Sequence, residues 1–138
     1  MIQTGTTSRS TAPEVGDVKL FKKYDVFVVR LQEGFIAMSR WCRHMNGRVV
    51  YERDHWRFRC PYHRAVYDRR GDCTGGQPDL NALWLHPLSI SNDGHVLVNT
   101  DDAIDRTHFE PSQAVSWGSE LTGWGSVTRP LARPTPRP

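Results

Sequence analysis

Two short clusters of side chains in this 138-residue chain have the chemistry of metal ligands. The first is Cys42-Arg43-His44 and the second is Cys60-Pro61-Tyr62-His63, with 15 residues between His44 and Cys60. Thiolates and neutral imidazoles are ligands that iron and zinc both accept. In the first cluster the two ligands lie two residues apart, so they can reach adjacent metal atoms. The stretch between the clusters is long enough to leave the metal along one strand and to return along another. The pattern therefore predicts one metal centre held by two loops.

Flanking residues extend this pattern from about Glu14 to Asp101. They are Pro61 between the second pair of ligands, Tyr67-Asp68 after His63, and the segment Gly75-Gly76-Gln77-Pro78. Together with the ligand clusters, they resemble the Rieske [2Fe–2S] domain family. The resemblance implies one [2Fe–2S] cluster, with Cys42 and Cys60 on one iron and His44 and His63 on the other.

A structural zinc site is the alternative, because it can also use two cysteines and two histidines. Zinc fingers usually take both cysteines from one knuckle and both histidines from another, whereas each cluster here mixes the two. The arrangement favours iron and sulfide, and zinc stays as the competing hypothesis.

The resemblance also indicates a subgroup. Members of the cytochrome bc type carry an extra cysteine in each ligand loop, and these two cysteines pair; the corresponding positions here are Gly47 and Tyr62. The chain is thus similar to the oxygenase-type ferredoxins, and a reducing compartment suits it. No signal peptide and no bilayer-spanning apolar stretch is visible, so we expect a cytoplasmic location. Cys73, the third cysteine, is expected to be a passive loop residue.

Neighbouring residues are expected to tune the cluster. Tyr67 occupies the position where the family's tyrosine donates a hydrogen bond to a ligating cysteine sulfur; an ordinary core aromatic is the other interpretation. Arg64 replaces the usual glycine after the second histidine, and a positive φ there would strain it and favour a locally different loop. Pro78 belongs to the glycine–proline segment that covers the cluster. In high-potential members a serine at the position of Ala65 donates a hydrogen bond to a bridging sulfide. Because this chain lacks that serine, we expect a reduction potential in the lower part of the family's range.

The elements that must position these residues are short and strand-like. Short runs rich in apolar residues predict strands at 26–29, 35–38, 49–51, 56–59, 66–68, 88–90 and 95–98. Asn92-Asp93-Gly94 predicts a hairpin between the last two of these, and only residues 110–116 weakly favour a helix. We therefore predict an all-β, Rieske-type fold of small antiparallel sheets with an inserted cluster-binding subdomain.

Composition divides the chain into three parts. Residues 1–14 are expected to form a flexible arm, 15–102 the Rieske domain, and 103–138 a C-terminal extension. The extension holds Trp117 and Trp124 in two Trp-Gly-Ser units and ends rich in proline and arginine. It is expected to contribute to partner docking and little to cluster assembly. Asp101, Asp102 and Asp105 are expected to form a solvated acidic end to the fold.

The charge is concentrated near the ligands. Residues 40–70 contain nine arginines and three acids, a net charge of +6, although the whole chain carries only +3. Such a zone stabilises an added electron and steers an acidic redox partner; no nucleic-acid motif accompanies it. We expect one-electron transfer as a subunit or docked partner of a larger redox enzyme complex. The alternative is a free Rieske ferredoxin between a reductase and an oxygenase. Since 138 residues leave no room for a second, catalytic iron domain, the protein is expected to be an electron-transfer component rather than an enzyme.

Overall fold

The computed structural model describes residues 14–43, 47–62, 64–76, 80–91 and 95–116. Within these residues the secondary structure consists of short β-strands and three 3-10 turns, without an α-helix, so the predicted all-β class is confirmed. Several predicted features lie outside the described residues: His44, His63, Pro78, the 92–94 turn, most of the arm, and the extension from residue 117.

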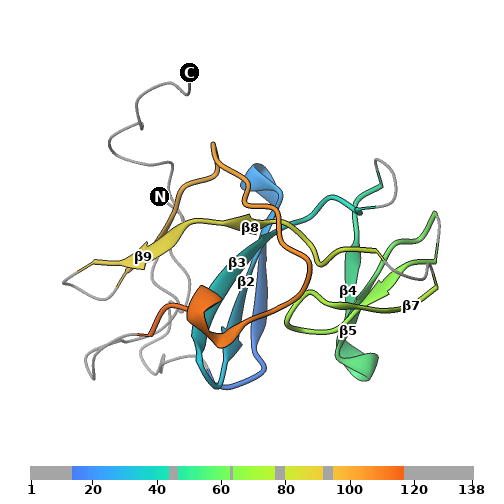
Figure 1. Cartoon of the computed structure of the whole chain (residues 1–138), viewed down its shortest axis with the longest axis horizontal. Helices are drawn as coiled ribbons and strands as arrows, with labels where there is room; N and C mark the ends of the chain where they lie inside the picture. The colour runs from blue at the N-terminus through green and yellow to red at the C-terminus, as the bar shows by residue number, and fades with distance from the viewer. Residues whose placement is uncertain (1–13, 44–46, 63, 77–79, 92–94, 117–138) are drawn as a thin grey trace.

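A four-stranded antiparallel sheet forms the centre of the molecule (Figure 1). Its order is β1 (Val18–Phe21), β2 (Val26–Leu31), β3 (Gly34–Ser39) and β8 (Leu85–His86). Strands β2 and β3 pair along their whole length, from Val26 opposite Ser39 to Leu31 opposite Gly34. All six residues of β3 are buried, because both faces of this sheet are covered.

Strand β2 contributes to a separate core on each face of the sheet, because successive side chains of a strand point to opposite sides. Phe27 and Val29 belong to the core that also contains the two cysteines of the predicted site. Val26 and Val28 belong to the second core, together with residues of β10 (Val96–Val98). Burial on both faces explains why this strand is a nearly continuous apolar run rather than an alternating one.

The second sheet is the predicted hairpin: β9 (Leu88–Ile90) pairs antiparallel with β10. The third sheet contains β4 (Val50–Glu52), β5 (Arg57–Arg59), β6 (Val66–Tyr67) and β7 (Cys73–Gly75). This third sheet, which we call the ligand subdomain, lies in sequence between β3 and β8 of the central sheet. The predicted insertion is therefore confirmed, and the two ligand loops are the β3–β4 and β5–β6 connections.

Three strands are additional to those expected from the sequence. Strands β1, β7 and β8 were not predicted, and η1 (Lys22–Tyr24) and η2 (Arg53–His55) occupy turns between strands. Residues 110–116 form no α-helix; they hold only the 3-10 turn η3 (Pro111–Gln113). Strand β8 has two residues, too few for a periodic pattern, and it exists because it pairs with the edge of β3.

The domain extends beyond the boundary predicted after Asp102. Ile104 forms a β-bridge with Leu85, and Val115 forms another with Phe35 at the start of β3. Between them Arg106 is only 7% exposed. Figure 1 shows this segment, in orange, crossing over the central sheet towards η3. Residues of the 103–116 segment thus contact the central sheet.

Candidate metal centre

The first ligand loop begins where β3 ends. The Val49 N–H donates to the Arg40 carbonyl (2.8 Å) and the Cys42 N–H donates to the Gly47 carbonyl (2.7 Å), so the two sides of the loop are stitched together. Cys42 lies at the mouth of this closed stem and is 3% exposed. Its companion His44 falls in the short stretch between the two sides that lies outside the described residues.

The second ligand loop closes in a similar way. The Cys60 N–H donates to the Ala65 carbonyl and the Arg64 N–H donates to the Cys60 carbonyl, each at 2.9 Å. Arg64 has a φ of 62°, in the left-handed region where glycine is usual. The arginine therefore adopts the glycine conformation at a cost of about 1–2 kcal/mol. The described backbone thus keeps a closed turn here, and Cys60 is fully buried within it.

The two loops lie against each other at Gly47. A Cβ atom at this position would lie 2.8 Å from Tyr62 Cδ2 and 2.9 Å from Cys60 Sγ, so no side chain fits. A Cβ at Gly76, whose φ is +81°, would lie 1.7 Å from the Arg64 carbonyl oxygen. The glycine segment after β7 is thus in contact with the second loop. Two buried thiols presented by loops in close contact are a suitable donor pair for one iron of a cluster.

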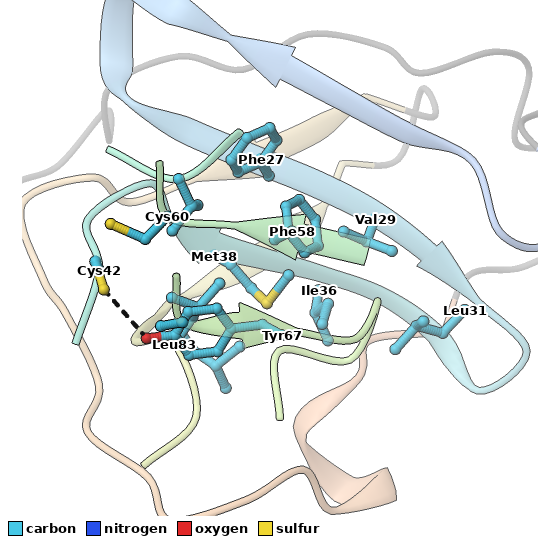
Figure 2. Close-up of a cluster of buried hydrophobic side chains, with 13 residues drawn as sticks. Phe27, Val29, Leu31, Ile36, Met38, Cys42, Phe58, Cys60, Tyr67 and Leu83 are labelled. Atoms are coloured by element: carbon cyan, nitrogen blue, oxygen red, sulfur yellow. Dashed lines mark hydrogen bonds between the residues drawn. The ribbon is translucent and has the colours of Figure 1, made fainter. Parts of the chain in front are cut away.

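Tyr67 links the first loop to the ligand subdomain. Its hydroxyl oxygen lies 3.4 Å from Cys42 Sγ and accepts a hydrogen bond from the Arg43 N–H at 3.1 Å (Figure 2). Because the oxygen already accepts from Arg43, its own proton is available to the sulfur. Burial, reinforced by the hydrogen bond with Cys42, raises the pKa of Tyr67 above its ordinary value. The phenol therefore stays protonated, which suits a thiolate acceptor.

Two carboxylates near the ligand loops each pair with two arginines, which leaves a net positive charge. Asp25 pairs with Arg40 and Arg48, and Glu52 pairs with Arg57 and Arg59. Hydrogen bonds from the latter two arginines lower the pKa of Glu52, so this carboxylate stays charged. Each such group of three charges keeps a net charge of +1.

A groove with a volume of about 820 Å³ borders the first loop and reaches Cys42. Trp41, Trp84 and His86 contribute to its lining. The Nδ1 atom of His86 lies 2.5 Å from the Asp102 carbonyl oxygen, and burial lowers the pKa of this histidine. The neutral ring donates its Nδ1–H to the carbonyl. The His86 ring is thus fixed in the groove wall, which gives it a structural role.

The structure also shows contacts that the sequence analysis missed. Asp105 forms an ion pair with Arg43, the residue between the first two predicted ligands, and the Arg43 guanidinium lies over the Trp84 ring, 4.1 Å from its centroid. Asp105 was expected to be merely solvated. No local signal could have revealed the pair, because 62 residues separate the partners.

The four predicted ligands are only partly within the described residues. Cys42 and Cys60 lie in the same buried core, whereas His44 and His63 lie outside what the structure describes. Among the described residues no group of three or more histidines, cysteines and acids is arranged as a metal site. The assignment of all four as iron ligands accordingly stays a prediction.

Residues 7–96 match the family model of the Rieske [2Fe–2S] domain. Similar solved structures include the cyanobacterial plasma membrane Rieske protein PetC3 from Synechocystis PCC 6803, with 23% identity, coverage of 59% of this chain and 83% of that chain, and a TM-score of 0.47. Another is the ferredoxin of carbazole 1,9a-dioxygenase from Nocardioides aromaticivorans IC177, with 22% identity, coverage of 60% and 88%, and a TM-score of 0.38. No match to a curated protein was found.

Proposed function

Because this chain belongs to the Rieske [2Fe–2S] domain family, whose domains transfer electrons, we propose that it holds one cluster through Cys42, His44, Cys60 and His63. The observation that supports this assignment most directly is the pair of buried thiols on two touching loops, one of them facing the Tyr67 hydroxyl.

The cluster, when bound, accepts and returns one electron, and its net charge changes from zero to −1 with neutral imidazoles. The protein's residues stabilise that added charge. Tyr67 donates to Cys42 Sγ, and the surrounding apolar core, which includes Phe58 and Leu83, excludes water from the thiolate side. A hydrogen bond to a sulfur is stronger when the sulfur is more negative, so it favours the reduced form.

We propose that the electron is exchanged with a protein that presents an acidic surface. Exposed side chains of the two ligand loops support this: Arg64 is exposed in the second loop, Arg48 is 51% exposed at the first loop, and Tyr62 of the second loop is 73% exposed. Cations around an exposed aromatic side chain suit a partner that is rich in carboxylates.

The proposed role is that of a subunit or docked partner in a larger redox complex, and the free ferredoxin is the second candidate. A reducing compartment such as the cytoplasm is proposed because Gly47 and Tyr62 stand where the disulfide-bonded members have cysteines. No helix among the described residues is long and apolar enough to cross a membrane.

Metal analysis tests the cluster assignment. Purified protein should contain about two irons and two sulfides per chain and show the spectrum of a Rieske centre. His44→Ala and His63→Ala should each abolish that spectrum, whereas His55→Ala, in the exposed turn η2, should retain it. Zinc in place of iron, or an unchanged spectrum in either ligand variant, would refute the assignment.

Isolation of the tagged protein from its native source separates the two roles. A subunit should elute with a partner in fixed stoichiometry at low and at high salt. A free ferredoxin should elute alone and bind its reductase and oxygenase only at low salt, because transient electrostatic contacts are screened.

A further inference from the structure

The segment after β10 runs back beside the strand that follows the ligand subdomain. Leu85 and Ile104 exchange both backbone hydrogen bonds, at 3.0 and 2.7 Å, and the Ala82 N–H donates to the Thr107 carbonyl at 3.0 Å. Residues 104–107 are therefore an extended backbone antiparallel to residues 82–85. In such a backbone successive side chains point to opposite sides, so Asp105 and Arg106 face different neighbours.

Arg106 faces the core and fixes the segment there. Its guanidinium donates to the carbonyl oxygens of Leu83 (2.8 Å) and Arg70 (2.9 Å), and to Gln113 Oε1 (2.7 Å). It also lies 3.3 Å from Met38 Sδ of β3. Burial lowers the pKa of this guanidinium to about 10, so the group stays charged at neutral pH. One side chain thereby connects the segment to the central sheet and to the ligand subdomain.

Asp105 faces the first ligand loop. Its carboxylate pairs with Arg43, whose side chain is only 9% exposed, and the Trp84 ring covers the other side of the guanidinium. A guanidinium that is nearly buried requires a partner, since an unpaired buried charge is costly. The Arg43 backbone N–H is bonded to Tyr67, whose hydroxyl also faces Cys42 Sγ. Both the side chain and the backbone of this residue are therefore held.

We propose that Asp105 is a positioning residue for the cluster: together with Trp84 it clamps Arg43 and so holds Cys42–Arg43, the start of the first ligand loop, and the Tyr67 hydrogen bond in place. Arg106 anchors the clamp in the core. This inference rests on the proposed function of the loop as a ligand loop. Arg43 and Trp84 lie within the match to the family, whereas Asp105 and Arg106 lie beyond residue 96, where that match ends. The C-terminal segment of this chain therefore supplies the carboxylate of the clamp and its anchor.

Asp105→Asn tests the clamp, because it removes the charge and keeps the shape. Glu110→Gln is the matched control: it removes a carboxylate from the same segment whose ion pair, among the described residues, is with the exposed His108. Asp105→Asn should accelerate cluster loss to a chelator about tenfold, the factor that corresponds to losing one charge-assisted hydrogen bond. It should also alter the electron paramagnetic resonance spectrum and change the reduction potential. Asp105→Glu should restore part of both, and Glu110→Gln should behave as the wild type.

Hydrogen–deuterium exchange supplies a readout that does not depend on the cluster. The amide of Arg43 should lose about tenfold in protection in Asp105→Asn and not in Glu110→Gln, if the clamp holds the loop. Unchanged protection and an unchanged rate of cluster loss would overturn the inference. So would faster cluster loss with an unchanged spectrum and potential, which is the result for a residue that only adds global stability. Protein that contains no iron but shows the protection change would refute the proposed function and retain the clamp.

Discussion

Replacement of Tyr67 by Phe removes one oxygen atom from the predicted cluster site and leaves the packed ring. Tyr67 is fully buried, so no water can take the place of the hydroxyl without rearrangement. Cys42 Sγ loses a donor at 3.4 Å and the Arg43 N–H loses its acceptor at 3.1 Å. The first loss affects the reduction potential, and the second affects stability.

The size of each effect follows from the geometry. A hydrogen bond to a charged group contributes about 1.5–3 kcal/mol in total. Cys42 Sγ is negative in both oxidation states of the cluster, and its contact with the Tyr67 hydroxyl is long. We therefore assign about 1 kcal/mol to the difference in hydrogen-bond free energy between the reduced and the oxidised state. For one electron a factor of ten corresponds to about 59 mV and about 1.4 kcal/mol, so the potential should fall by about 40 mV. The orphaned Arg43 amide should lower the free energy of unfolding by about 1–2 kcal/mol.

Potentiometric titration followed by visible circular dichroism measures the first effect, and urea unfolding measures the second. Tyr51→Phe is the control, because it removes a hydroxyl from another aromatic residue of the same core. The Tyr51 ring, in β4, packs on Phe58 with ring centroids 5.0 Å apart. This variant should leave the potential unchanged. A Tyr67→Phe protein with the wild-type potential would show that the hydroxyl does not tune the cluster, and the hydrogen bond would then be only structural.

Four further predictions follow from other sites. The reduction potential of the wild type should lie in the lower part of the Rieske range of roughly −150 to +300 mV; a potentiometric midpoint near the top would contradict this. Arg64→Gly should raise the free energy of unfolding by about 0.5–1 kcal/mol, since relief of the positive φ exceeds the entropy cost of glycine, and it should slow low-salt association with the partner. The free energy of unfolding should fall as the pH drops below about 6.5, because burial lowers the pKa of His86 in the folded state and the unfolded state therefore binds its proton at a higher pH. His86→Gln should reduce this pH dependence, measured by urea unfolding. Truncation after Ser116 should leave the cluster spectrum intact and weaken partner binding. Truncation after Asp102 should instead destabilise the domain. Equal melting temperatures of the two truncated proteins would contradict this difference.

Local patterns were sufficient for much of the fold. The strands that were predicted correctly, such as β2 and β3, have runs of β-branched and aromatic residues with turn residues beside them. The hairpin of β9 and β10 was predicted from the apolar runs on both sides of Asn92-Asp93-Gly94, because such a turn joins two flanking strands. The insertion of the ligand subdomain followed from the spacing of the two ligand clusters.

Elements that depend on a distant partner were missed for a physical reason. Strand β8 is two residues long and is stabilised by its pairing with β3. The segment at 104–107 contains charged residues and no apolar alternation, so composition assigned it to a solvated tail. Its stability comes from backbone pairing with residues 82–85 and from the buried Arg106. Neither contact has a local signature.

The same division applies to the site. The sequence by itself determined which residues are candidate ligands: cysteines and histidines at short spacings predict thiolate and imidazole ligands, and Gly47 and Tyr62 stand where the disulfide-bonded members have cysteines. Only the tertiary structure decided that Arg64 takes the backbone conformation of a glycine, that the Tyr67 hydroxyl faces Cys42, and that Asp105 holds Arg43 from 62 positions away. Short spacings constrain which atoms can reach one centre, whereas contacts between distant segments depend on how the whole core packs.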